Sequence, residues 1–134
     1  MSAVYVKQQH LVEMIDHARE EAPVEACGIL AGKEGRVVEV YRARNADHSP
    51  TSYRLDPEEQ YRIFVDIEDR GLEVLGIYHS HPSSPAAPSS IDLERAYYPE
   101  AIHFLISLVD PGDPQVRAFR ITDGETSEHE IVIA

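Results

Sequence analysis

Residues 79–92 read HSHPSSPAAPSSID and directly follow a continuous apolar run, Val74 to Tyr78. A short run of β-branched, aliphatic and aromatic residues predicts a buried central strand. His79 and His81 are expected at the exit of this strand. Because side chains at positions i and i+2 of a strand project from the same face, both imidazoles can bind one ion.

The rest of the stretch predicts how a third ligand reaches the two histidines. Pro82 has no backbone donor and a fixed φ, so it ends the strand and begins a stiff connection containing further prolines. Ser89 then caps a helix that we expect to run to about Tyr98. This arrangement places Asp92 in the first turn of the helix, directed back toward the end of the strand.

Two imidazole nitrogens and a carboxylate oxygen are ligands that zinc prefers, and three protein ligands leave a fourth position for water. The sequence therefore predicts a Zn²⁺ site formed by His79, His81 and Asp92. Ser89 and Asp92 also have the spacing of a capping box, and a histidine pair near a strand end is often structural. Capping and metal binding are compatible if Ser89 does the first and Asp92 the second.

The pattern His-x-His-Pro-x6-Ser-x2-Asp resembles the signature of the JAMM, or MPN-plus, zinc metallopeptidases. That family also carries a catalytic glutamate in the context Glu-x-x-Gly-x-Leu-x-Gly, and residues 25–32 read EACGILAG, with Glu25 at the glutamate position. The resemblance covers nearly the whole chain from Glu25 onward. It implies a minimal prokaryotic-type member and an α/β fold of MPN/JAMM type, a mixed β-sheet flanked by helices with a cytidine-deaminase-like topology.

The resemblance also implies the chemistry. Zinc lowers the pKa of a water that it binds from about 15.7 toward about 7, which makes a nucleophile at neutral pH. Glu25 would take a proton from this water and pass it to the leaving nitrogen, and the Ser89 hydroxyl would stabilise the oxyanion. Without the resemblance, Glu25 would be interpreted as an ordinary solvated acid that follows an acidic helix.

Enzymes of this family cleave amide or isopeptide bonds at the C-terminal tail of ubiquitin-like or sulfur-carrier proteins, so the resemblance implies a zinc-dependent peptidase or isopeptidase here. Whether the leaving group is a lysine side chain or a C-terminal cysteine stays open. A non-catalytic MPN-type scaffold or interaction domain is the alternative, although such members usually lack part of the ligand set. A zinc nucleoside deaminase would need Pro-Cys-x-x-Cys ligands, which a chain with one cysteine cannot supply.

Length and charge limit the setting. The chain has 134 residues, which predicts a single domain over residues 1–134. With 24 acidic and 12 basic side chains its formal net charge is −12, which disfavours nucleic acid, anionic membranes and a DNA-repair role. There is no signal-peptide pattern, and one cysteine allows no intrachain disulfide, so a cytoplasmic location is expected. Exposed strand edges leave homodimer formation open.

Hydrophobic spacing and turn residues predict the remaining elements. We expect helices at about 10–22 and 56–71, and strands at 27–31, 36–42, 74–78, 102–109, 116–121 and 128–133. Cys27 is expected in the core, and His103 is expected either in the core or next to the metal ligands. The histidines expected to be solvated are His10, His17, His48 and His129.

Overall fold

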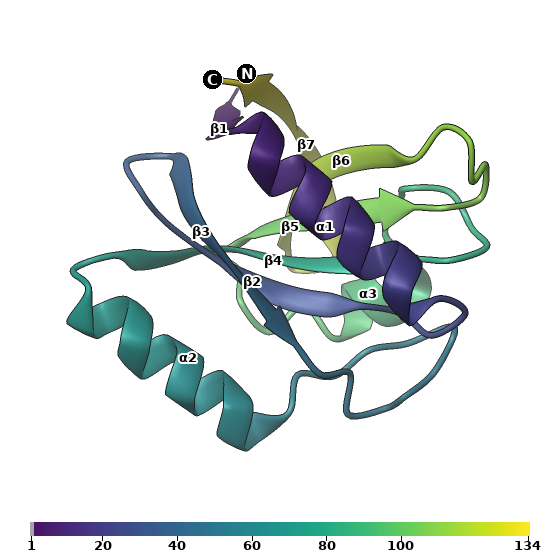
Figure 1. Cartoon of the computed structure of the whole chain (residues 1–134), viewed down its shortest axis with the longest axis horizontal. Coiled ribbons are helices and arrows are strands. Elements are labelled where there is room, and N and C mark those ends of the chain that lie inside the picture. The colour runs from purple at the N-terminus through teal and green to yellow at the C-terminus, as the bar shows by residue number, and fades with distance from the viewer. Residues whose placement is uncertain (1) are drawn as a thin grey trace.

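A computed structural model describes residues 2–134. In chain order its elements are β1 (Ala3–Val6), α1 (Gln8–Glu21), β2 (Cys27–Lys33), β3 (Arg36–Ala43), α2 (Pro57–Asp69), β4 (Glu73–His81), α3 (Ser90–Glu94), β5 (Ile102–Ser107), β6 (Gln115–Thr122) and β7 (Glu125–Ile133). The strands form one sheet, around which the helices are arranged (Figure 1).

The sheet is mixed, with the strand order β1-β3-β2-β4-β5-β6-β7. β4 runs parallel to β5, whereas β2 is antiparallel to both of its neighbours, β3 and β4. β1 pairs in parallel with β7 and, through Tyr5 and Arg36, with β3, so that the sheet closes into a barrel. The predicted class, an α/β fold with a mixed sheet flanked by helices, is confirmed.

The alternation of side chains along the central strands produces two apolar layers. On one face, Met14 of α1 packs in a buried cluster that includes Leu30 of β2. On the other face, Ile67 of α2 packs in a cluster that includes Ile29, the neighbour of Leu30 in sequence. The central strands are therefore buried on both sides, as a continuous apolar run predicts.

The glycines of residues 25–32 are required by close packing in the sheet. A Cβ atom on Gly28 would lie 2.2 Å from Cε2 of Tyr78, and one on Gly32 would lie 2.3 Å from the backbone oxygen of Arg36. The Tyr78 ring occupies the space above Gly28, where its hydroxyl contacts His17 Nδ1 of α1 at 2.7 Å. This part of the motif thus fixes how β2 lies against its neighbours.

The third helix is shorter than predicted. The sequence predicts that it continues to about Tyr98, but α3 ends at Glu94. The following residues make long-range contacts instead, because Arg95 pairs with Asp47 at 2.7 Å and the Tyr98 hydroxyl accepts a hydrogen bond from Gln60 of α2. These contacts hold residues 95–98 outside a helical path. The short strand β1 was also not predicted, since four residues give a weak pattern.

Three of the four histidines expected to be solvated are buried. His10, His17 and His129 are 6%, 5% and 7% exposed, whereas His48 lies at the surface as predicted. His10, Met14 and His17 are spaced by four and three positions, so they lie on the same, inner face of α1. This spacing could have predicted that the two histidines are buried. Cys27 and His103 are buried, as expected.

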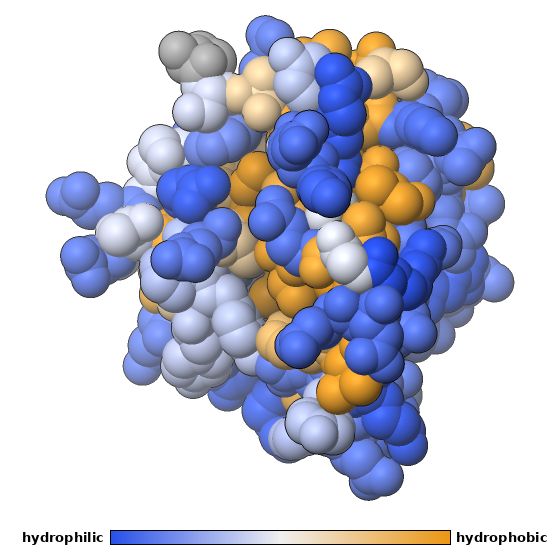
Figure 2. All heavy atoms as spheres, turned by 90° about the vertical axis from the view of Figure 1, so that its left-hand side faces the viewer, coloured by the Kyte–Doolittle hydropathy of each residue, from blue (hydrophilic) through white to orange (hydrophobic). Residues whose placement is uncertain are grey.

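The surface is mostly hydrophilic on the face shown in Figure 2, where polar side chains surround a central apolar strip. Exposed large hydrophobic side chains include Tyr61 and Tyr97, at 70% and 71%. Within residues 2–134, no helix has the length and apolar character needed to cross a membrane.

Candidate metal centre

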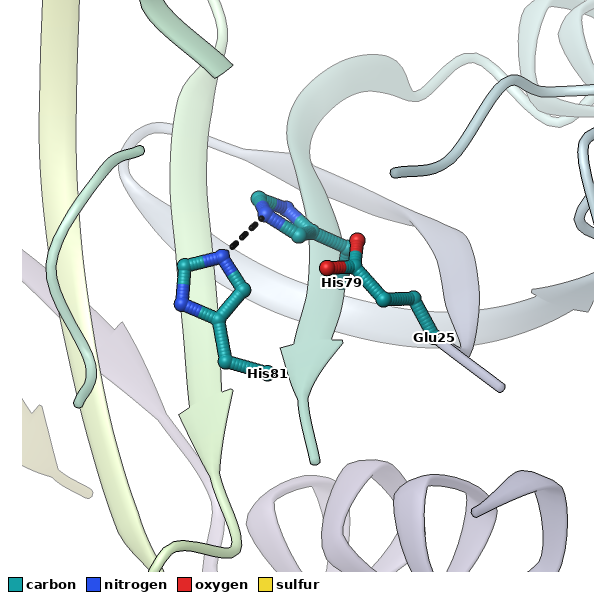
Figure 3. Close-up of side chains that lie close together, drawn as sticks. All are labelled: Glu25, His79 and His81. Atoms are coloured by element: carbon teal, nitrogen blue, oxygen red, sulfur yellow. Dashed lines mark hydrogen bonds between the residues drawn. The ribbon is translucent and has the colours of Figure 1, made fainter. Parts of the chain in front are cut away.

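Both histidines lie within β4, at its C-terminal end, rather than just beyond it. His79 pairs with Cys27 of β2 and with Leu105 of β5, so it lies in the centre of the sheet. Because His79 and His81 are two positions apart, their rings project from the same face, and their Nε2 atoms are 3.2 Å apart (Figure 3).

Asp92 reaches the same point from α3 because its helix start holds the carboxylate in place. Ser89 is the N-cap, and its hydroxyl oxygen accepts a hydrogen bond from the Asp92 N–H at 3.1 Å. The Ser89 N–H donates in return to Asp92 Oδ2 at 2.9 Å. Oδ1 of Asp92 then lies 3.1 Å from His79 Nε2, and Oδ2 lies 3.0 Å from His81 Nε2.

The three side chains fit a metal ion. Ligands held at roughly 2.0–2.1 Å in a tetrahedral site are roughly 3.3 Å apart, close to the separations of 3.0–3.2 Å seen here. His81 Nδ1 lies 2.9 Å from the backbone oxygen of Pro85, to which it donates. That hydrogen bond leaves the Nε2 lone pair directed at the centre, an arrangement typical of metal-binding histidines.

Glu25 lies beside the two histidines, just before β2 begins (Figure 3). Its backbone N–H donates to the oxygen of Ser49 at 2.9 Å, and its backbone oxygen accepts from Asn45 Nδ2 at 3.0 Å. The next residue, Ala26, donates its N–H to Ser80 Oγ at 2.7 Å. Ser80 stands between the two histidines in sequence, so the strand that carries the imidazoles also fixes the position of Glu25.

The Glu25 carboxyl group lies close enough to the histidines to share a metal with them. One ligand atom from each of Glu25, His79 and His81 lies within 4.8 Å of the others. Glu25 is 3% exposed, and its Oε1 has no hydrogen-bond partner among residues 2–134. The chain therefore has a site for a metal ion in which either Asp92 or Glu25 can complete the two histidines.

The electrostatics of these groups suit a cation. Burial raises the pKa of Glu25 to about 8, with His81 acting to lower it and Asp92 to raise it further. For Asp92 burial acts to raise the pKa, but contacts with His79 and His81 outweigh it and hold the pKa below its usual range. Burial lowers the pKa of His79, which favours the neutral imidazole that a metal requires.

The structure adds a residue that sequence reasoning missed. The Tyr53 ring stacks on the His79 ring, with 4.3 Å between centroids and an angle of 21° between planes. Tyr53 belongs to the irregular segment between β3 and α2, and no sequence pattern links it to residue 79. It restricts the rotation of the His79 imidazole, whose Nδ1 has no hydrogen-bond partner among residues 2–134.

Comparison with known proteins agrees with this geometry. Residues 7–122 match the family model described as prokaryotic homologs of the JAB domain. The chain belongs to this family. A CysO-cysteine peptidase of Mycobacterium tuberculosis is 42% identical over 120 residues, covering 88% of this chain and 82% of the relative. A probable TtuB-protein conjugate cleaving protease of Thermus thermophilus is 36% identical over 123 residues, covering 91% and 78%.

A solved structure shows the same fold. The solution structure of a protein from Desulfitobacterium hafniense has a TM-score of 0.89 and 36% sequence identity, and the match covers 98% of this chain and 92% of that chain. The resemblance to JAMM-type peptidases is thus confirmed, and this JAB-family chain is a hydrolase of JAMM type.

Proposed function

We propose that the metal is zinc and that this JAB-family hydrolase cleaves amide bonds at the C-terminal tail of a ubiquitin-like or sulfur-carrier protein. The observation that carries the proposal is the convergence of His79, His81 and Asp92 beside the buried carboxyl group of Glu25. The relatives support the substrate class, because one is named for cleaving CysO-cysteine and another for cleaving TtuB conjugates.

His79, His81 and Asp92 would hold the zinc ion. When bound, zinc supplies Lewis-acid chemistry, since it acidifies a water molecule and polarises a carbonyl group. Two neutral nitrogens and one carboxylate match the preference of zinc for mixed nitrogen and oxygen ligands. Glu25 would then remain free of the metal, beside the attacking water.

Glu25 has the properties of a general base. Burial raises the pKa of Glu25 to about 8, and a bound cation would lower it toward neutrality, where a carboxyl group can both accept and release a proton efficiently. In the proposed reaction Glu25 accepts a proton from water as the oxygen attacks the carbonyl carbon. It then gives this proton to the nitrogen as the C–N bond breaks, so that the products are a carboxylic acid and an amine, which ionise to a carboxylate tail and an ammonium group.

Ser89 would stabilise the charge that develops on the carbonyl oxygen. Its Oγ already accepts the hydrogen bond from the Asp92 N–H. The hydroxyl proton is left for donation, and a donor placed at an oxyanion is worth about 10²–10³ in turnover. Capping and catalysis can therefore use different parts of the same hydroxyl group.

Metal analysis of two variants tests the assignment of ligand and base. We expect about one zinc per chain in the wild type and in Glu25→Gln, and much less in Asp92→Asn, because Asp92, but not Glu25, is proposed as a ligand. Hydrolysis should be lost in both variants. Glu94→Gln, on the exposed side of α3, is the matched control and should keep zinc and activity. Loss of zinc from Glu25→Gln with retention in Asp92→Asn would reverse the two roles.

A substrate assay tests the function itself. The zinc-loaded enzyme is incubated with ubiquitin-like proteins whose Gly-Gly tails carry either a C-terminal cysteine or an isopeptide-linked lysine, and the products are identified by mass. Release of the intact tail from at least one of them is expected. No cleavage of either substrate, with zinc bound, would refute the proposal.

We also propose that residues 1–134 act as a single domain in the cytoplasm, on a protein substrate and without nucleic acid or membrane. The net charge of −12 supports this setting, since it repels polyanions. A homodimer is compatible with the fold, and light scattering of the purified chain decides between monomer and dimer.

A further inference from the structure

Two buried imidazoles at or beside the metal centre each have one nitrogen without a hydrogen-bond partner. Among residues 2–134, these nitrogens include Nδ1 of His79 and Nε2 of His103. The two residues are 2% and 3% exposed, so neither nitrogen is satisfied by bulk solvent. The proposed reaction uses His79 as a metal ligand and leaves His103 without a role.

The sheet places the two imidazoles on the same face of neighbouring strands. β4 and β5 run parallel, and their register pairs Ile77 with His103 and His79 with Leu105. Paired residues and residues two positions apart share a face, so His103 is the diagonal neighbour of His79. Diagonal neighbours in a sheet are within reach of each other when their side chains are long or aromatic. His79 also acts on the pKa of His103, which shows that the two rings are within electrostatic range.

The neighbouring strands offer these two nitrogens no strong hydrogen-bond partner. A buried polar atom without a partner destabilises the folded protein, and such atoms are therefore rare. His79 and His103 are each paired with one residue on either side of their strands. These four residues are apolar or nearly so: Cys27 and Leu105 beside His79, and Ile77 and Phe119 beside His103. The two unpartnered nitrogens are thus best matched to each other.

The protonation of the two rings makes their free nitrogens complementary. His79 directs Nε2 at the metal centre, where it lies 3.1 Å from Asp92 Oδ1, so a neutral His79 bound to a metal carries its proton on Nδ1. Burial is the main cause that lowers the pKa of His103 to about 4, and His79 acts in the same direction, so His103 is neutral at pH 7. A hydrogen bond with the backbone of Tyr98 acts to raise this pKa. Because Nε2 has no partner, that bond belongs to Nδ1–H, and Nε2 keeps a free lone pair.

We propose that His103 is a positioning residue for the metal ligand His79, which donates its Nδ1–H to His103 Nε2 through one buried water molecule. The water is needed because no direct hydrogen bond joins the two nitrogens. This inference rests on the proposed function, from which it takes His79 as a zinc ligand. Metal-binding histidines usually donate their second ring N–H to an acceptor that fixes the ring. His81 has such an acceptor in the backbone oxygen of Pro85, and His103 supplies the one for His79.

Zinc affinity, measured by competition with a chromogenic chelator, tests this role. In His103→Phe, which removes the acceptor, we expect the affinity to fall by about 10–100-fold. His103→Gln keeps a side-chain oxygen that can accept a hydrogen bond, and it should restore most of the lost affinity. His129→Phe is the matched control, because it also removes a buried histidine, but from β7, which β6 separates from β5. This control should bind zinc as the wild type does.

Two results of this comparison would overturn the proposal. If His103→Phe bound zinc as tightly as the wild type, His103 would be a core residue only. If His103→Gln lost as much affinity as His103→Phe, the loss would come from packing and not from the missing acceptor. Circular dichroism of all three variants shows that the affinities compare folded proteins.

NMR of the histidine nitrogens in the zinc-loaded wild type tests the hydrogen bond itself. We expect His103 to carry its proton on Nδ1, and the Nδ1–H of His79 to exchange slowly with solvent. In His103→Phe this exchange should become faster. A proton on His103 Nε2 would overturn the proposal, because the nitrogen could not then accept. A lack of hydrolysis of tail substrates would refute the proposed function but would not change the zinc affinities or the NMR result, so the two proposals can fail separately.

Discussion

The hydroxyl group of Ser89 is proposed to make two hydrogen bonds, one as acceptor and one as donor. Its oxygen accepts the Asp92 N–H, and its proton is proposed to reach the substrate. In Ser89→Ala we expect kcat to fall about 10²-fold with zinc content retained. Loss of the cap should also lower the free energy of unfolding by about 1 kcal/mol.

Metal content, turnover and urea unfolding are measured together on this variant and on Ser90→Ala, its exposed neighbour. The control should match the wild type in all three. If Ser89→Ala kept full turnover, or lost zinc in proportion to activity, the hydroxyl would have only its capping role.

The sequence predicts which side chains lie together at the metal centre, but not the residues that hold them in position. Glu25 and the stretch from His79 to Asp92 could be predicted because each motif is short and its spacing follows strand and helix geometry. Tyr53 and Asn45 could not be predicted, since they reach the centre from an irregular segment. The hydrogen bond from the Ala26 N–H to Ser80 Oγ could not be predicted either, because it depends on how β2 lies beside β4.

The pairing of β2 with β4 depends on a glycine. Gly28 lies opposite Tyr78 in the sheet, and a Cβ atom there would meet the ring at 2.2 Å and the backbone oxygen of Tyr41 at 2.5 Å. Gly28→Ala should therefore lower the free energy of unfolding by about 1–3 kcal/mol, the usual effect of overpacking. Chemical denaturation measures this change.

Gly112→Ala is the control for that substitution, because a Cβ atom on Gly112 would meet nothing closer than Asp110 Oδ1 at 3.6 Å. Its stability should stay near that of the wild type. Equal stability of both variants would show that the sheet adjusts around residue 28 without cost.

Elements with strong local signals were predicted well, and elements fixed by distant contacts were not. The start of α2 follows from Asp56, which caps it, and from Pro57 in its first turn. The C-terminal end of α3 could not be predicted from the residues of the helix, because Arg95 forms a hydrogen bond with Asp47, which lies 48 positions earlier in the chain. The position of Asp92 was still predicted, since it depends only on the first turn.

For the molecule as a whole, the buried histidines predict a loss of stability in acid. Burial lowers the pKa values of His10, His17 and His129 below the ordinary value of 6.5. Near pH 6.5 the unfolded chain therefore binds protons that the folded chain does not. The contribution of these three histidines to the free energy of unfolding should fall as the pH drops below about 6.5, until the lowered pKa values are reached, whereas Glu25, whose pKa burial raises to about 8, acts in the opposite direction over this range.

Urea unfolding between pH 7.5 and 5.5 measures this dependence. His17→Gln should reduce the slope of stability against pH, whereas His48→Gln, at an exposed position, should leave it unchanged. A slope that is the same in all three proteins would show that His17 does not contribute.

The acidic surface predicts a dependence on salt. A net charge of −12 favours partners with a basic surface, and the Debye length shortens from about 10 Å at 0.1 M salt to about 3 Å at 1 M. For a substrate protein with a basic face, kcat/KM should be several-fold lower at 1 M salt than at 0.1 M salt, because salt screens the attraction between the two proteins. A short neutral tail peptide serves as the control, and its kcat/KM should change little. A rise with salt for the basic substrate would contradict this prediction.

The proposed ligands and base come from three segments of the chain: Glu25 precedes β2, His79 and His81 end β4, and Asp92 opens α3. The three proposed ligands lie within residues 79–92, but Glu25 lies far earlier in the chain, so the complete centre forms only when β2 pairs with β4 in the native topology. Any ion that prefers this geometry acts on the folding equilibrium by mass action and shifts it toward the native side. Removing the ion with a chelator would thus lower the free energy of unfolding. The supply of metal therefore influences the fraction of the protein that is in its native state.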